Sequence, residues 1–349
     1  MLREINLVGE PYAHGLEFGR QLHAEIRAFL EIDREAVFKR LPRPPADLYE
    51  AAGEFATDVE KTAPEIWADL RGLAEGSRRS LEEILYIQYR REVVRKHAEI
   101  ESQDCSLFAL QHARWGAILG QTIDLEPYLR PFGVIVRTAA WQATPSHIQY
   151  SFAGLLGYAG LNTSGLCVGI NMLDGGRWDG GLSPYLLVRL LLQQQGLSEC
   201  LSHLQRTRRS SSRCITLLAG ESAISVEMLP DSHGELHGLP LVHTNHFEHP
   251  SNLAQERSNL LARANSRQRQ AELKAKLQAL ATEDIDGIRQ LLASHENHPD
   301  GICFHSQGKA YRNETVAAVV MAPRDKRLYA LQGSPCEQSF TSYPLRQTP

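Results

Sequence analysis

Apolar residues recur at helical spacing through the first hundred residues of the chain. Between Gly15 and Leu41 they predict one helix, which the proline-rich residues 41–46 should end. A second helix is predicted over about residues 48–73. A third should begin at Ser80, because Ser80 and Glu83 are spaced as a capping box, in which each side chain satisfies a free backbone amide of the other.

After about residue 104 the pattern changes to short β-rich runs separated by turn signals, such as the hairpin turn at 162–165. Strands are predicted over 106–110, 117–123, 133–141, 148–152, 214–219, 223–229, 316–322 and 327–332. Helices are predicted over 183–195, 197–207, 253–282 and 284–294. Helices on both sides of two groups of antiparallel strands indicate a layered α+β fold rather than strict βαβ alternation.

Composition narrows the class of protein without naming a function. The 349 residues are 42% hydrophobic and 22% charged, which is typical of a folded globular protein. A formal net charge of −4 gives no reason to expect a nucleic-acid or membrane partner, and we interpret the basic run Arg206–Arg213 as a solvated loop. Met1–Gly9 lacks the apolar core of a signal peptide, and no run reaches the roughly 18 apolar residues of a membrane span. We therefore predict a cytoplasmic protein.

Cysteine spacing points away from disulfides and structural metal. The six cysteines contain no Cys-x-x-Cys pair; they are Cys105, Cys167, Cys200, Cys214, Cys303 and Cys336. His295, Glu296 and His298 lie close in sequence, but their spacing is not His-Glu-x-x-His and a proline follows, so we interpret them as a loop. The sequence thus predicts no disulfide and no bound metal, and a cysteine that matters should act as a thiol.

Cys105 stands at the first strand after the helical segment. Taken alone, such a cysteine is most often a small buried apolar residue. A series of motifs in order along the chain changes that interpretation. They are Gly9-x-Pro11-Tyr12-x-x-Gly15-x-x-x-Gly19-Arg20, Asp104-Cys105-Ser106, Gly120-Gln121-Thr122-Ile123-Asp124, Gly160-Leu161-Asn162-x-x-Gly165-Leu166, His243-Thr244-Asn245-His246-Phe247, Asn265-Ser266-Arg267 and Gly333-x-Pro335-Cys336-Glu337. Together they resemble the acyl-coenzyme A:6-aminopenicillanic acid acyltransferase family of self-processing cysteine N-terminal-nucleophile enzymes, along nearly the whole chain.

The resemblance implies a fold, a processing event and a class of substrate. The expected fold is the four-layer αββα N-terminal-nucleophile hydrolase fold with a helical N-terminal segment. Cleavage between Asp104 and Cys105 would divide the chain into residues 1–104 and 105–349, which should stay associated as one folded unit. The expected substrate is a linear amide or an acyl donor. The resemblance implies no metal or organic cofactor, and acyl-coenzyme A is a candidate co-substrate.

The resemblance also assigns roles to individual residues. Cys105 would be the nucleophile, and its α-amine, freed by cleavage, would take the thiol proton. Asn245 would stabilise the oxyanion, and Asp124 would hold the α-amine or the substrate. Supporting roles at the pocket are expected for Ser106, Thr122, His243 and Arg267.

Two alternatives remain at this stage. Thr122-Ile123 stands where the family usually has Asn-Trp, and Phe304 stands where it commonly has arginine, which favours an uncleaved binding protein on the same fold. The other alternative is a conventional thiol hydrolase with a Cys105–His243 dyad and no cleavage. The departure at Phe304 also argues against a charged substrate of the 6-aminopenicillanic acid kind.

Overall fold

Two β-sheets stacked face to face form the centre of the molecule in the computed structural model, which describes residues 2–41, 47–97, 105–280, 284–298, 300–307 and 313–345. The eight-stranded sheet has the order β1 (Arg3–Leu7), β4 (Gly133–Thr138), β5 (His147–Phe152), β6 (Ala159–Asn162), β7 (Cys167–Met172), β8 (Arg213–Ala219), β9 (Ser222–Met228) and β10 (His233–His237). The six-stranded sheet has the order β11 (Leu241–His243), β2 (Leu107–His112), β3 (Gly116–Leu125), β12 (Glu314–Ala322), β13 (Arg327–Gln332) and β14 (Thr341–Pro344).

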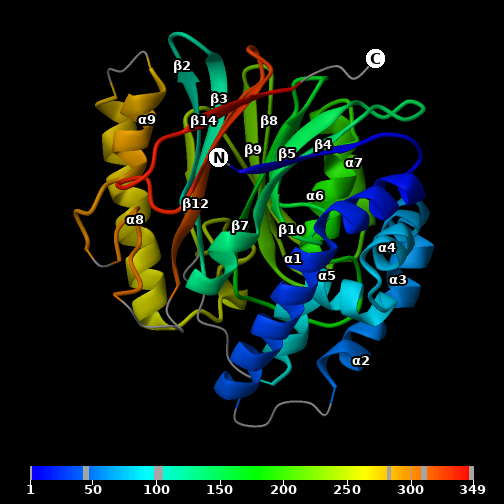
Figure 1. The fold of residues 1–349 in the computed structure, drawn as a ribbon. Coiled ribbons are helices and arrows are strands. Elements are labelled where there is room, and N and C mark those ends of the chain that lie inside the picture. Colours follow the sequence, from blue (N-terminus) through cyan, green and yellow to red (C-terminus); the bar gives the residue numbers. More distant parts are fainter. Residues whose placement is uncertain are drawn as a thin grey trace.

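Helices cover both outer faces of this pair of sheets (Figure 1). Helices α8 (Leu260–Gln278) and α9 (Ile285–Leu292) pack on the six-stranded sheet, and α6 (Pro184–Leu191) and α7 (Leu197–Arg206) pack on the eight-stranded sheet. Leu107 and Ala109 of β2 face the inter-sheet core, whereas Phe108 and Leu110 face the α8–α9 layer. Both faces of this strand are therefore buried, because successive side chains point to opposite sides of a sheet. The arrangement is the expected αββα layering.

The N-terminal segment is built into the same core. It consists of β1, α1 (Pro11–Arg40), α2 (Leu48–Gly53), α3 (Ala56–Thr62), α4 (Pro64–Ser77) and α5 (Leu81–Arg95). β1 pairs in parallel with β4, and the apolar face of α1 joins one buried cluster with the strands. Helices α1 and α4 touch at their backbones, since a Cβ on Gly15 would lie only 1.8 Å from the carbonyl oxygen of Asp69. Residues on both sides of the Cys105 boundary thus share one hydrophobic core.

Most predicted elements are confirmed, with two corrections. The helix predicted over 48–73 is three helices, α2, α3 and α4. Ala63, which precedes Pro64, has φ −144°, because the proline ring disfavours a helical conformation at the residue before it. The helix predicted over 253–282 is α8, which begins only at Leu260. The capping box is confirmed, since Ser80 Oγ accepts from the amide of Glu83 at 3.2 Å and the amide of Ser80 donates to the Glu83 carboxylate at 2.7 Å.

Candidate functional site

Cys105 lies immediately before β2, in the space between the two sheets, with only 1% of its surface exposed. Its backbone carbonyl accepts hydrogen bonds from Asn171 Nδ2 at 2.9 Å and from Arg269 Nη1 at 3.4 Å. Its Sγ is 3.7 Å from the hydroxyl of Tyr158. The nucleophile predicted from the sequence is therefore held by residues from β7, from α8 and from the loop before β6. Asp104, the residue before it, lies outside the described residues.

Asn245 is the second predicted residue that the fold brings into the network around Cys105. Its Oδ1 accepts from Arg269 Nη2 at 2.8 Å, its Nδ2 donates to the carbonyl of Met172 at 3.1 Å, and its backbone amide donates to Ser266 Oγ at 2.7 Å. Because Arg269 can only donate, the amide end of Asn245 is fixed as the donor end. Asn245 is thereby joined to Cys105 through Arg269, with its amide held in one orientation.

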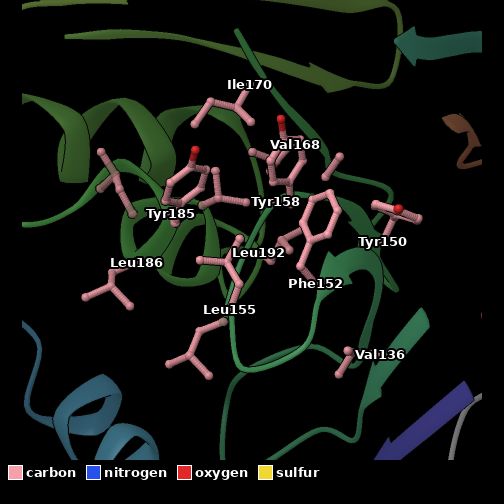
Figure 2. Close-up of a cluster of buried hydrophobic side chains, with 14 of the residues drawn as sticks. Val136, Tyr150, Phe152, Leu155, Tyr158, Val168, Ile170, Tyr185, Leu186 and Leu192 are labelled. Carbon is pink, nitrogen blue, oxygen red and sulfur yellow. The ribbon is translucent and has the colours of Figure 1, made fainter. Parts of the chain in front are cut away.

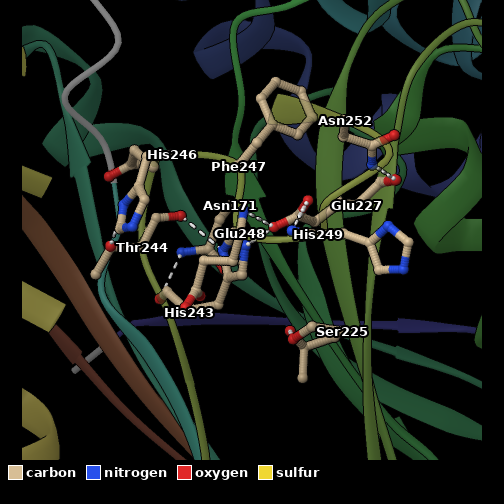
Figure 3. Close-up of polar contacts among 12 residues, drawn as sticks. Asn171, Ser225, Glu227, His243, Thr244, His246, Phe247, Glu248, His249 and Asn252 are labelled. Carbon is tan, nitrogen blue, oxygen red and sulfur yellow. Dashed lines mark hydrogen bonds and ion pairs between the residues drawn. The ribbon is translucent and has the colours of Figure 1, made fainter. Parts of the chain in front are cut away.

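His243 sits in a buried ion pair that supports the turn carrying Asn245 (Figure 3). Its Nδ1 faces the carbonyl of Thr244 at 2.8 Å, and its Nε2 faces Glu227 Oε1 at 3.0 Å. Both partners accept, so both ring nitrogens must carry hydrogen and the ring is an imidazolium. Burial alone would lower the pKa of His243, but Cys214 and the Glu227 carboxylate outweigh burial and raise that pKa well above its usual value.

Glu227 extends this support to the rest of the turn. Its carboxylate accepts from the backbone amides of Glu248 and His249 at 2.6 and 3.0 Å, and its carbonyl accepts from Asn252 Nδ2 at 3.1 Å. Burial opposes ionisation, but the hydrogen bond from His243 and these amides keep the pKa of Glu227 below its usual value. Residues 243–252 are therefore anchored through Glu227, and both ring nitrogens of His243 are engaged within this network.

The pairing of β2 with β3 brings Ser106, just before β2, next to Thr122 on β3, and Asp124 lies on the same strand as Thr122. The amide of Ser106 donates to Thr122 Oγ1 at 3.1 Å, and Arg269 Nη1 donates to Ser106 Oγ at 2.9 Å. Asp124 is two residues after Thr122 on β3, so its side chain leaves the same face of the strand. Its Oδ1 accepts from Thr315 Oγ1 at 2.7 Å. All three predicted residues thus flank the entry of the chain into β2.

Arg267 does not join them. It lies on the exposed side of α8, and the buried guanidinium in the site belongs to Arg269. Helical spacing carries the signal that would have found Arg269, because Ala262, Asn265, Arg269 and Leu273 repeat at three- and four-residue intervals and all are buried. Arg269 Nε donates to Asn265 Oδ1 at 2.9 Å on that face. Asn171, the other residue that the sequence analysis missed, is the next-to-last residue of the apolar strand β7, and the pattern around it gives no comparable signal.

A small apolar pocket lies beside the thiol. Aromatic and aliphatic side chains dominate its lining, which includes Phe29, Ile87, Leu125, Leu129, Phe152, Leu155, Tyr158 and Tyr185, with Arg90 and Arg91 at one side. Figure 2 shows Phe152, Leu155, Tyr158 and Tyr185 gathered in this region. Tyr158 belongs to both places, because its ring lines the pocket and its hydroxyl faces Cys105 Sγ. The lining includes residues from the N-terminal helices α1 and α5 and from strands of both sheets, β3 and β5.

Comparison with known proteins agrees with this geometry. Residues 113–337, more than half of the chain, match the family model described as acyl-coenzyme A:6-aminopenicillanic acid acyl-transferase. The chain belongs to this family. The 40 kDa form of acyl-coenzyme A:6-aminopenicillanic-acid-acyltransferase from Emericella nidulans is 23% identical over 327 residues, which cover 89% of this chain and 87% of that protein. The resemblance expected from the sequence is thereby confirmed, and the chain is a member of an enzyme family of acyltransferases.

Solved structures resemble this member of the acyl-transferase family more distantly. Penicillin V acylase from Agrobacterium tumefaciens has a TM-score of 0.47 at 11% identity, covering 65% of this chain and 83% of that chain. A variant of the conjugated bile acid hydrolase from Clostridium perfringens has a TM-score of 0.48 at 10% identity, covering 70% and 98%. An N-acylethanolamine-hydrolyzing acid amidase ortholog from Caenorhabditis elegans has a TM-score of 0.45 at 17% identity, covering 63% and 93%.

Membrane insertion was not expected for this family member. Among the helices of the described ranges, none combines the length and the apolar character that a membrane span requires.

Proposed function

We propose that this chain is a self-processing cysteine N-terminal-nucleophile enzyme that hydrolyses a linear amide or transfers its acyl group through an acyl-Cys105 intermediate. The observation that carries the proposal is the network in which Asn171 and Arg269 hold the carbonyl of Cys105 and the same Arg269 binds the side chain of Asn245. A buried cysteine held in this way, joined through Arg269 to an oriented amide, is suited to attack a carbonyl carbon.

Self-cleavage would need only the thiol and water. Cys105 Sγ would attack the carbonyl carbon of Asp104, and the bond from that carbon to the Cys105 nitrogen would break as the nitrogen takes a proton. The resulting thioester would be hydrolysed by water, which leaves a carboxylate on residues 1–104 and restores the thiol on residues 105–349. The new α-amine has an ordinary pKa of about 7.7–8.0, close to neutral pH.

Turnover would use the same thiol with its own α-amine as base. The α-amine takes the thiol proton, the thiolate attacks the substrate carbonyl, and the proton passes to the leaving nitrogen. Asn245 would donate to the oxyanion, and Asp124 would hold the α-ammonium form. Water or an acceptor amine would then release the acyl group. This cycle assigns no proton transfer to His243, whose ring nitrogens both face acceptors.

The apolar pocket beside Tyr158 is the proposed place for the acyl group. Its lining offers apolar surface from Phe152, Leu155 and Tyr185, and the hydroxyl of Tyr158 lies 3.7 Å from Cys105 Sγ. Burial of apolar surface contributes roughly 25 cal/mol per Å², so an aliphatic or aromatic acyl group would bind there better than a charged one. Arg90 in the lining is engaged, since it pairs with Asp33 and Glu126.

The test is the intact mass of freshly purified protein beside Cys105→Ala. We expect the wild type to give fragments of residues 1–104 and 105–349, and the variant to give one chain. Cys200→Ala is the matched control, since Cys200 is also buried and its burial raises the pKa of its thiol to about 12, which makes it a poor nucleophile. That variant should be cut like the wild type.

The same measurement separates the alternatives. An uncut wild type without amidase or acyl-transfer activity would support a binding protein on this fold. An uncut but active wild type would support a thiol hydrolase. Cleavage that persists in Cys105→Ala would exclude Cys105 as the processing residue.

A further inference from the structure

Four potential metal ligands from three separate segments converge on one point beside β12. His295 follows helix α9, Cys303 and His305 precede β12, and Cys336 follows β13. One ligand atom of each lies within 4.8 Å of those of the other three. The catalytic cycle proposed above uses none of the four. Because they come from different parts of the chain, only the fold brings them together.

Four of the six distances between their ligand atoms are close to the edges of a tetrahedron around one ion. Cys303 Sγ and Cys336 Sγ are 3.6 Å apart, and His305 Nε2 lies 3.5 Å from the first and 3.6 Å from the second. His295 Nε2 is 3.0 Å from His305 Nε2. Zinc bonds of about 2.3 Å to sulfur and 2.0–2.1 Å to nitrogen give tetrahedral edges of about 3.8, 3.6 and 3.3 Å for S–S, S–N and N–N.

We propose that His295, Cys303, His305 and Cys336 bind a zinc ion. Two thiolates and two imidazoles are the ligands of structural zinc sites, and four protein ligands leave no position for a substrate. Softer and harder cations are less suited to this mixed sulfur and nitrogen set. The ion can reach the site, because Cys336 is exposed at the surface while Cys303 is buried behind it. This proposal does not depend on the proposed function and replaces the prediction of a metal-free chain.

Neighbouring hydrogen bonds already orient the ligands. The amide of Cys303 donates to the carbonyl of Ser294 at 3.1 Å, which ties the segment of Cys303 to that of His295. Arg289 Nη1 donates to the carbonyl of Pro335 at 2.9 Å, directly before Cys336. Supporting contacts of this kind hold the ligands of metal sites in position. The ion would therefore bind to a largely preformed site.

The site also has a physical connection to the active site. Phe304, between two of the ligands, donates its amide to Thr315 Oγ1 at 2.9 Å, and that hydroxyl donates to Asp124 Oδ1 at 2.7 Å. Zinc would clamp residues 303–305 against β12 and so position Thr315 and Asp124.

The first experiment measures zinc in the full-length wild type. The protein is expressed with zinc in the medium and purified without a histidine tag or chelator, and its metal is quantified by mass spectrometry. We expect about one zinc per chain, as for a closed structural site. Addition of Co²⁺ to metal-stripped protein should give visible d–d bands and a near-ultraviolet thiolate charge-transfer band, which are typical of tetrahedral sulfur and nitrogen ligation. A chelator should also lower the melting temperature of the wild type.

Variants test the ligand set. Cys336→Ser changes a surface residue and should lose most of the zinc and the chelator-sensitive shift in melting temperature. Two controls should keep both. Cys200→Ser alters a buried thiol on another helix, and His298→Ala removes the neighbouring ring whose centroid lies 6.1 Å from that of His295. Equal loss in a control and in Cys336→Ser would show that the ligand set is wrong.

The wild type alone can overturn the proposal if the variants fold poorly. Absence of zinc together with absence of a Co²⁺ thiolate band would refute it. A Cys303–Cys336 disulfide found by peptide mapping in protein handled without oxidant would also refute it, because the two sulfurs would then be bonded to each other and could not bind zinc as thiolates.

Discussion

Arg269 joins Cys105 to Asn245: one guanidinium donates to the carbonyl of the former at 3.4 Å and to the side-chain oxygen of the latter at 2.8 Å. The two residues with the central roles in the proposed chemistry come from segments 140 positions apart in sequence numbering, and one buried cation fixes their relative place. Arg269 is therefore a positioning residue, because it acts through both partners.

Replacing Arg269 should lower activity without removing the nucleophile. We expect Arg269→Gln to reduce kcat by about 10²-fold, the usual effect of a small misplacement of reacting groups. Arg267→Gln is the matched control from the exposed side of the same helix and should behave like the wild type. Steady-state kinetics on both variants checks this, and equal effects would contradict the assignment of the buried role to Arg269.

Asn245→Asp separates the amide donor from the hydrogen bond to Arg269. The carboxylate still accepts from Arg269, but the donor for the oxyanion is lost, so kcat should fall about 10²–10³-fold. Circular dichroism should show an unchanged fold. A kcat near that of the wild type in a folded variant would remove Asn245 from the chemistry.

His243→Gln distinguishes the proposed mechanism from a Cys–His dyad. Glutamine can still donate to Glu227, so we expect a folded enzyme that keeps more than about a tenth of the wild-type kcat, whereas loss of a general base typically costs 10²–10⁴-fold. His243→Leu leaves the buried Glu227 charge without its cationic partner and should cost about 3–5 kcal/mol of unfolding free energy. Abolished activity in a stable His243→Gln protein would favour the dyad.

Acid should destabilise the fold through buried neutral histidines. Burial, then the charge of Arg189, lowers the pKa of His14 from 6.5 to about 4. Between these values the unfolded chain binds more protons than the folded one, so stability is full above pH 6.5 and falls as the pH drops towards 4. At roughly 1.4 kcal/mol per unit of pKa, His14 contributes on the order of 3 kcal/mol at most.

The contribution of His14 is measured by urea unfolding of the wild type and of His14→Leu at a series of pH values from 7.5 to 4, spaced by about 1 pH unit. The variant should show a shallower loss of stability. Some pH dependence should remain, because burial also lowers the pKa of His147. An identical slope in the two proteins would mean that His14 does not contribute.

Local pattern was enough for most of the fold. Long apolar runs predicted the central strands, since β3 and β12 are buried on both faces. Six strands, β1, β6, β7, β10, β11 and β14, were not predicted, and they are only three to six residues long. β1 and β11 also pair with strands that are distant in sequence, β4 and β2. The helix break before Pro64 could have been seen from the proline itself, but the regular spacing of apolar residues led us to predict one continuous helix.

Some residues of the candidate site could be predicted from the sequence and others could not. Motif order predicted Cys105, Asp124 and Asn245, and the fold brings Cys105 and Asn245 into one network through Arg269. Asn171 and the His295, Cys303, His305 and Cys336 cluster could not be predicted, because their meaning lies in side chains that converge only after folding. His305 is 10 residues from His295 and 31 from Cys336, which matches no local ligand spacing.

The short strand β1 protects the edge of the eight-stranded sheet. Its parallel pairing along Val134–Thr138 occupies backbone groups of β4 that would otherwise be open to another chain. The amide of Leu2 also donates to the hydroxyl of Tyr343, which fastens the start of the chain to β14 of the other sheet. A protein produced from Cys105 onward would lack this guard strand and expose a ready template for intermolecular pairing. Such a chain should aggregate, and adding residues 1–104 during refolding should keep it monodisperse.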